Sequence, residues 1–233
     1  MVTTPKTRQP IWQLMGRLFR AHPWHGVRLG EKGSDVVTCY IEITPSDTVK
    51  YELDKATGLL KLDRPQRFSN FCPALYGLLP QTYCGTRVAA LSAEKTGRPA
   101  ISGDMDPLDV CVLTERPVSH GDILLQAIPI GGLRMIDGSE ADDKIVAVLV
   151  GDSAYGSFRD IKDCPEALVS RLIHYFETYK LVPGSVENPC EITHVYGCQE
   201  AFDVIRRAQA DYHEKFGSLE SLLDAAMQSS LTG

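Results

Sequence analysis

Three aspartates crowd the segment "GDMDPLDV", residues 103–110, which runs directly into the apolar "VCVL". They are Asp104, Asp106 and Asp109. Neighbouring carboxylates repel one another and raise each other's pKa unless a cation or a strong set of donors lies between them. If the segment is extended, Asp104 and Asp106 share one face and can converge on a positive ion. The alternative is a loop of turn-forming acids, which Asp and Gly ahead of Pro107 also suit.

A second acidic stretch, "MIDGSEADDKIVAV", also leads straight into an apolar run. It supplies Asp137, Glu140, Asp142 and Asp143, followed by Lys144. Carboxylates without His or Cys among them favour hard ions such as Mg²⁺ or Mn²⁺ over zinc. An EF-hand calcium loop is excluded for the first stretch, because Leu stands at a ligand position and Asp stands where the sharp turn needs Gly.

The segment "VKYELD" carries a third group of charges. In a strand, Lys50 and Glu52 lie on one face while Tyr51 and Leu53 lie on the other. Glu42, on the preceding segment, can reach the charged pair across a hairpin. The pair therefore projects into a cavity, or it forms an ordinary solvated edge with an ion pair of little energetic worth.

Short strands are the elements that must position these charges. Apolar or alternating runs bounded by turn residues predict strands at 36–43, 49–53, 59–62, 86–91, 109–114, 122–130 and 144–150. Helices follow at 166–180, with Asp163 as a cap and Pro165 in the first turn, and from about 199 toward 227. The pattern predicts one α+β domain, a closed β-barrel with flanking helices.

Composition limits the function classes. The chain has 233 residues, 43% hydrophobic and 23% charged, enough for a buried core. A net charge of -6 argues against a nucleic-acid binder, and no apolar run is long enough to span a membrane. Seven scattered cysteines without a CxxC pair indicate free thiols in a reducing cytoplasm, with Cys111 in the core.

The N-terminal residues are basic and amphipathic, because the first acid is Glu31 and apolar residues recur at helical spacing over 11–19. Such a start is typical of a helix that packs on the domain. An organellar transit peptide is the minor alternative.

Taken together, these motifs resemble the soluble family I inorganic pyrophosphatases. "GDMDPLDV" matches the Asp-x-Asp-Pro-x-Asp signature of that family, and "YIEI", "VKYELD", "TGLLKLDR", "MIDGSEADDK" and "HYFETYK" agree with it in order and kind. The resemblance covers about residues 36–180, the predicted catalytic core. Residues 1–34 are then an N-terminal extension and 181–233 a C-terminal helical segment of a single domain.

The resemblance implies an OB-like barrel that hydrolyses pyrophosphate to two phosphates with several Mg²⁺ ions, for which Mn²⁺ can substitute. The metal ligands that it implies are Glu52, Asp104, Asp109, Asp137 and Asp142. Asp106 corresponds to the candidate general base. The implied substrate ligands are Lys50, Arg64, Tyr76, Lys144, Tyr179 and Lys180, with Glu42 and Asp63 as supporting carboxylates.

The chain departs from compact bacterial members of the family in the segment 80–102, which is longer and is expected to form a hairpin or a loop. Thr178 replaces a histidine that some members carry at a subunit contact, which leaves the geometry of the expected homo-oligomer open between hexamer, which is favoured, and dimer or trimer. His174 is expected to be a packing or interface residue. Two rival functions remain: a metal-dependent phosphatase or nucleotide pyrophosphohydrolase, and a non-catalytic barrel that holds a structural cation.

Overall fold

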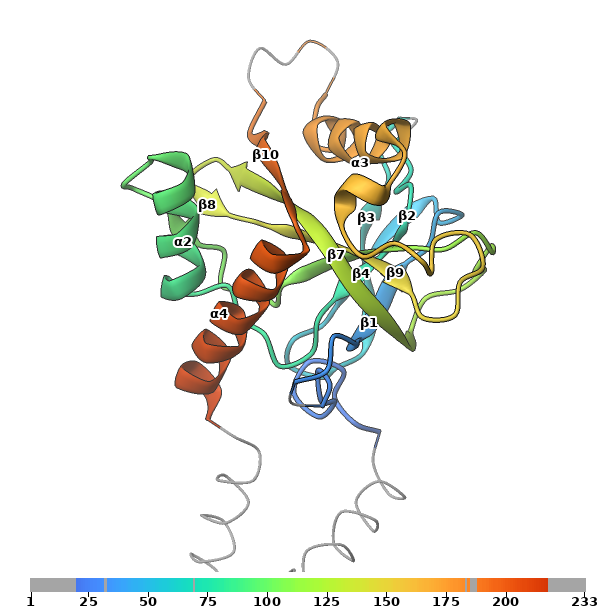
Figure 1. Cartoon of the computed structure of the whole chain (residues 1–233), viewed down its shortest axis with the longest axis horizontal. Helices are drawn as coiled ribbons and strands as arrows, with labels where there is room; N and C mark the ends of the chain where they lie inside the picture. Colours follow the sequence, from blue (N-terminus) through green and yellow to red (C-terminus); the bar gives the residue numbers. More distant parts are fainter. Residues whose placement is uncertain (1–19, 32, 69, 183, 185–187, 218–233) are drawn as a thin grey trace, which may run out of the picture.

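A ring of five strands forms the centre of the molecule (Figure 1). The computed structural model describes residues 20–31, 33–68, 70–182, 184 and 188–217. In ring order the strands are β1 (Val37–Ile43), β4 (Leu75–Leu78), β6 (Asp109–Leu113), β9 (Lys144–Leu149) and β7 (Ile123–Asp137). Because β7 also pairs with β1, the strands close on themselves and confirm the predicted barrel.

The strands β6 and β9 are parallel neighbours, and Asp109 is aligned with Lys144 at their first residues. After Asp109 all residues of β6 are buried, and β9 is buried as far as Val148. Continuous apolar runs such as "VCVL" and "IVAV" are typical of strands that are covered on both faces. The pairing places the ends of both acidic stretches at the same edge of the barrel.

Further strands extend the ring or stand apart from it. A separate hairpin consists of β2 (Val49–Leu53) and β3 (Leu60–Pro65). Two short strands, β5 (Ser102–Gly103) and β8 (Glu140–Ala141), lengthen the sheet beyond β7. The strand β10 (Cys190–Gly197) also pairs with β7.

Three α-helices pack around the strands in the described part of the chain. They are α2 (Thr86–Thr96), α3 (Glu166–Thr178) and α4 (Cys198–Phe216). The helices α2 and α4 lie next to each other on one flank, while α3 lies above the β2–β3 hairpin in the same view (Figure 1). A short 3₁₀ turn, η1 (Ile161–Asp163), precedes α3.

Several predicted elements differ from the structure. The strand predicted at 86–91, and the hairpin or loop predicted for 80–102, are wrong because this segment forms α2. Val88, Leu91 and Ser92 are buried at helical spacing, and Gly97 ends the helix with a φ of 68°. The short apolar run "VAAL" is compatible with either structure when it is considered alone.

The C-terminal segment predicted as helical contains β10, which the sequence analysis missed. The predicted cap of α3 is also wrong: Asp163 belongs to η1, and Pro165 occupies the N-cap position without a side-chain hydrogen bond. The second helix is predicted from about residue 199 toward 227. In the structure α4 begins at Cys198, one residue before the predicted start, and the predicted end lies outside the described residues. The predicted helix at 11–19 lies outside them as well.

The core confirms the expectation for the cysteines. All seven are free, and six of them are buried, including Cys111 with no exposed surface. None of the helices in the described residues is long and apolar enough to cross a membrane.

Candidate active site

Charged side chains from distant parts of the chain line one pocket of about 230 Å³ at the edge of the barrel. It contains all the site residues that the sequence predicts, with one exception. Those residues are Glu42, Lys50, Glu52, Arg64, Tyr76, Asp104, Asp106, Asp109, Asp137, Asp142, Lys144, Tyr179 and Lys180. The exception is Asp63, which is not a lining residue but pairs with two of them, Lys50 at 3.3 Å and Arg64 at 2.6 Å.

The first acidic stretch enters the pocket as a tight turn. Met105 has a φ of 66°, and the main-chain N–H of Asp106 donates to Oδ1 of Asp104 at 2.9 Å. The segment is therefore not extended, and the turn alternative describes its backbone correctly. Asp104 and Asp106 nevertheless both line the pocket, as does Asp109 at the start of β6.

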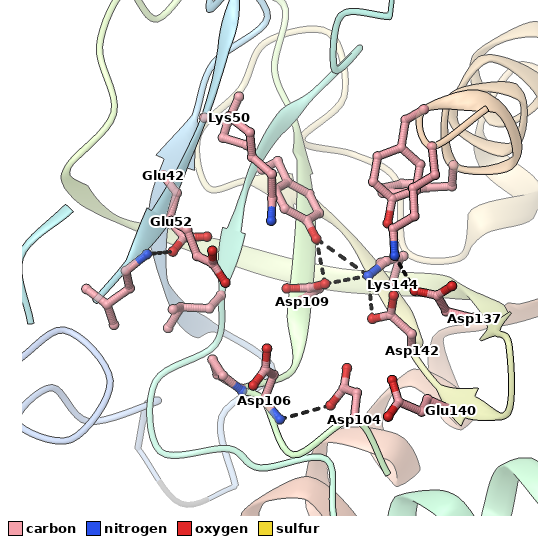
Figure 2. A pocket seen from close by; sticks show the side chains of 18 of the residues that line it. Glu42, Lys50, Glu52, Asp104, Asp106, Asp109, Asp137, Glu140, Asp142 and Lys144 are labelled. Atoms are coloured by element: carbon pink, nitrogen blue, oxygen red, sulfur yellow. Dashed lines mark hydrogen bonds and ion pairs between the residues drawn. The ribbon is translucent and has the colours of Figure 1, made fainter. Parts of the chain in front are cut away.

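Lys144 joins the two acidic stretches at the first residues of β6 and β9. Its side chain is buried, and its ammonium group forms ion pairs with Asp109 and with Asp142, the latter at 2.5 Å. The hydroxyl of Tyr76 donates to Asp109 at 2.5 Å. Figure 2 shows the carboxylates of Asp109 and Asp142 on either side of this ammonium group.

Burial and mutual repulsion dominate the electrostatics of the carboxylates. Burial, reinforced by the neighbouring Asp142, raises the pKa of Asp104 to about 9. Burial likewise raises the pKa of Glu42 to about 8. Burial alone would lower the pKa of Lys144, but the adjacent Asp109 and Asp142 outweigh it and raise that pKa well above its ordinary value. The pocket therefore brings together more carboxyl groups than can all be ionised at neutral pH unless a further cation enters.

The β2–β3 hairpin forms another wall of the pocket. Lys50 and Glu52 both face the pocket, as the alternation of the strand predicts, although a bulge interrupts the pairing between Lys50 and Tyr51. Glu42 on β1 accepts a hydrogen bond from the main-chain N–H of Leu53 at 2.6 Å. This bond ties the hairpin to the barrel, which is compatible with the supporting role expected for Glu42.

The C-terminal end of α3 closes the remaining side. Tyr179 and Lys180 follow the helix directly, and the ammonium group of Lys180 forms an ion pair with Asp137 at the end of β7. His174, on the same helix, does not line the pocket. This position agrees with its expected role outside the chemistry.

Sequence reasoning assigned no role in the site to two charged residues of the pocket. Lys55, on the turn after β2, lines it and forms an ion pair with Asp106. Glu140, on β8, also lines it and belongs to the second acidic stretch. The acidic residues beside Glu140 in the sequence could have indicated its place in the pocket, whereas nothing in the local sequence indicates that Lys55 reaches Asp106.

Asp143, in the same acidic stretch as Glu140, points away from the pocket and forms a buried ion pair with Arg134 at 3.0 Å.

Comparison with known proteins agrees with this geometry. The family profile described as inorganic pyrophosphatase matches residues 39–213. The chain belongs to the inorganic pyrophosphatase family. It is 56% identical over 199 residues to the inorganic pyrophosphatase of Chlamydia muridarum, covering 84% of this chain and 95% of the relative. It is also 40% identical over 167 residues to soluble inorganic pyrophosphatase 1 of Arabidopsis thaliana, covering 72% and 70% of the two chains.

Solved structures of the family share the fold. The inorganic pyrophosphatase of Thermus thermophilus superposes with a TM-score of 0.68 at 29% sequence identity, covering 82% of this chain and 99% of that one. The barrel with packed helices is therefore the OB-like fold of the pyrophosphatase family.

Membership of the family implies dependence on divalent metal ions, and the donor set of the pocket fits such ions. Its potential ligands are carboxylates, the oxygen donors that hard cations prefer. Asp104 is half-buried beside Asp142, and its pKa of about 9 indicates that its carboxyl group is short of neighbouring positive charge. In the described part of the chain, no group of three or more His, Cys, Asp or Glu side chains is already arranged to coordinate a metal ion. Lysine ammonium groups pair with Asp106, Asp109, Asp137 and Asp142 instead.

Proposed function

We propose that this chain hydrolyses inorganic pyrophosphate to two phosphates in the pocket at the edge of the barrel. The observation that carries the proposal is the convergence there of carboxylates and cations from the hairpin, both acidic stretches and the end of α3. A substrate with several negative charges needs cations to enter a site crowded with acids, and the family to which the chain belongs is that of the inorganic pyrophosphatases.

The carboxylates are assigned to metal binding as follows. Asp104, Asp109 and Asp142 would hold the first ion, and Asp109 would also reach a second. Asp137 and Asp142 would take an ion that arrives with the substrate, and Glu52 would serve another. The chemistry that bound Mg²⁺ ions supply in such a site is neutralisation of charge and a more acidic water.

Asp106 is assigned as the general base. Its carboxylate, 38% exposed, lines the pocket and accepts the proton of the attacking water. The water oxygen then forms a bond to phosphorus while the bond to the bridging oxygen breaks. The leaving phosphate takes the electron pair of that bond.

Cations around the pocket are assigned to the phosphate oxygens. Arg64 offers a planar, bidentate contact, while Lys50, Lys144 and Lys180 act as point charges. Tyr179 donates from its hydroxyl group, and Tyr76 orients Asp109 through its hydrogen bond. Lys144 and Lys180 are paired with acids in the structure. When substrate and metal ions enter, the lysines must exchange these carboxylates for phosphate oxygens, and the carboxylates must exchange the lysines for metal ions.

A phosphate-release assay tests the function. Wild-type protein should release phosphate from pyrophosphate with Mg²⁺, and chelation by EDTA should abolish the release. Asp109→Asn should lower turnover at least about 100-fold while far-UV circular dichroism stays unchanged, and the exposed Asp35→Asn should behave as wild type. Equal release from nucleotides or sugar phosphates would favour the broader phosphatase. No release from any substrate would favour the non-catalytic barrel.

Three finer assignments accompany the proposal. The metal is Mg²⁺, with several ions in each site, and Mn²⁺ can substitute for it. Titration of the metal-free protein with each ion distinguishes the two. The protein is a homo-oligomer. Its mass from analytical ultracentrifugation distinguishes a hexamer from a trimer, a dimer or a monomer. Its location is cytoplasmic, which the seven free thiols support because a reducing compartment keeps cysteines unpaired.

A further inference from the structure

The main chain of the turn that carries the candidate base is held from behind by the segment that leads into α2. The N–H of Cys84 donates to the carbonyl of Asp106 at 2.8 Å, and the N–H of Met105 donates to the carbonyl of Cys84 at 3.2 Å. The N–H of Leu108 donates to Oγ1 of Thr82 at 2.9 Å. The position of Asp106 therefore depends on where Cys84 lies.

Packing leaves little space for movement between these two segments. A Cβ atom on Gly103 would lie 2.1 Å from the carbonyl oxygen of Cys84, so the main chains touch directly. Tyr83 ties the same segment to α4, because its N–H donates to the carbonyl of Ala208 at 2.9 Å. The turn, the segment before α2 and α4 thus form one packed unit.

Asp211 on α4 fixes the start of α2. Its side chain is buried and accepts hydrogen bonds from the main-chain N–H groups of Gly85 at 3.1 Å, Arg87 at 3.0 Å and Val88 at 3.2 Å. Gly85 is the N-cap residue and has no side chain to do this itself. A carboxylate at this position satisfies the free N–H groups and complements the positive end of the helix dipole. Figure 1 shows the neighbouring helices.

We propose that Asp211 is a positioning residue for pyrophosphate hydrolysis, because it fixes Gly85 and thereby the adjacent Cys84 that holds Asp106. The inference rests on the proposed function. Without this carboxylate, three N–H groups lose their acceptor and the first turn of α2 must shift toward water. Cys84 moves with it, and the carboxylate of Asp106 leaves its position in the pocket.

The chain offers matched controls. The guanidinium group of Arg87 pairs with Asp211 at 3.0 Å and also with Glu214. Arg87→Ala removes both ion pairs and Glu214→Gln removes only the second, while both variants keep the Asp211 carboxylate at the start of α2. A role of Asp211 limited to its ion pair with Arg87 predicts similar losses in Arg87→Ala and in the Asp211 variants, whereas positioning predicts a loss only when Asp211 changes.

The experiment measures kcat, the KM for pyrophosphate and the Mg²⁺ dependence of Asp211→Ala, Asp211→Asn and both controls. Asp211→Ala should lower kcat by about 10-fold to 100-fold, the range that a misplacement of about 1 Å produces. Asp211→Asn, which retains one acceptor oxygen, should lose less. The controls should stay within about 2-fold of wild type, as expected for exposed ion pairs. If Asp211→Ala does not fold, the same comparison of kcat with the controls is made with Asp211→Asn.

Hydrogen exchange provides a readout that does not depend on turnover. The amides of Cys84 and Met105 should exchange faster in Asp211→Asn than in Glu214→Gln. Unchanged exchange and parental kcat in a folded Asp211→Asn protein would overturn the inference, as would an equal loss in Arg87→Ala. A wild-type protein that does not hydrolyse pyrophosphate would overturn the proposed function instead.

Discussion

The ammonium group of Lys55 forms an ion pair with the carboxylate of Asp106, 51 residues further along the chain. Lys55 lies on the turn between β2 and β3, where its carbonyl oxygen lies 3.2 Å from Nε2 of His22. The other pocket residues around Asp106 include the acids Glu52 and Asp104 (Figure 2). Lys55 is thus the cation that contacts the candidate base.

Replacing Lys55 should lower kcat for pyrophosphate hydrolysis but change the free energy of unfolding only slightly. Lys55→Ala should reduce kcat by about 10-fold, because the Asp106 carboxylate loses the partner that orients it, and Lys55→Arg should recover part of the rate. The side chains are 45% and 38% exposed, so the free energy of unfolding should fall by less than about 1 kcal/mol. Steady-state kinetics and urea unfolding separate the two effects. Lys61→Ala, on the exposed surface of the same hairpin, is the control, and identical kinetics in both alanine variants would refute the role of Lys55.

Mg²⁺ should raise the melting temperature of the wild-type protein. A ligand that binds only the folded state stabilises it by about 2.7 kcal/mol at 100 times its dissociation constant. Asp109→Asn should remove most of this shift, because Asp109 is assigned to two ions. Differential scanning fluorimetry with and without Mg²⁺ measures the shift, and NaCl at equal ionic strength controls for screening. An equal Mg²⁺ shift in both proteins would contradict the ligand assignment.

Arg134 should be essential for stability although it does not line the pocket. Its side chain is fully buried and pairs with Asp143 at 3.0 Å and Glu200 at 3.1 Å. Arg134→Ala should lower the free energy of unfolding by about 3–5 kcal/mol, because it leaves the Asp143 carboxylate buried without its cation. Adding Asp143→Asn should restore part of this loss.

Urea unfolding checks that stability prediction. The control is Arg206→Ala, since the side chain of Arg206 is 65% exposed and its ion pair with Asp203 should contribute less than about 1 kcal/mol. A similar small effect for Arg134→Ala would show that the buried network does not stabilise the fold.

Asp160 should stabilise the start of α4 in a pH-dependent way. Its carboxylate accepts hydrogen bonds from the main-chain N–H groups of Cys198 at 2.9 Å and Lys162 at 3.2 Å. Partial burial disfavours its charged form, but these hydrogen bonds outweigh burial and lower its pKa below the ordinary 3.8. Asp160→Asn should reduce stability by about 1 kcal/mol at neutral pH, because the amide keeps one acceptor oxygen for the two N–H donors and one hydrogen bond is lost.

The sign of the pH effect follows from the lowered pKa. The contribution of Asp160 is complete above the unfolded pKa of 3.8 and is lost as the pH falls through the lower folded pKa. The stability difference between wild type and Asp160→Asn should therefore be equal at pH 7 and pH 5 and smaller at pH 3. Urea unfolding at the three values measures it, and a difference that does not change with pH would rule out the carboxylate as its source.

Local pattern predicted the parts of the fold in which sequence neighbours determine structure. The apolar runs after Asp109 and Lys144 indicate buried strands, and β6 and β9 are such strands. Acids precede both runs, but only the parallel pairing of β6 with β9 brings the two acidic stretches to one edge of the barrel. The alternation in "VKYEL" likewise predicted that Lys50 and Glu52 share a face.

Relationships between distant residues could not be predicted in this way. The apolar positions Val88 and Leu91 fit a strand or a helix until α4 is placed beside them. Asp211 accepts a hydrogen bond from the N-cap residue Gly85, 126 positions earlier in the chain, and its own sequence context is that of an ordinary helix. Arg134 lies in an apolar strand, and only the fold brings it to Asp143 and Glu200.

The parallel alignment of Asp109 with Lys144 also determines when the catalytic charges can meet during folding. Parallel neighbours require a crossover, and here the connection includes the whole of β7. Contacts between distant residues form slowly, because the entropy of loop closure is lost before the contact stabilises the chain. Recovery of catalysis after dilution from denaturant therefore marks completion of the barrel, and a nascent chain that ends before Lys144 has no functional centre.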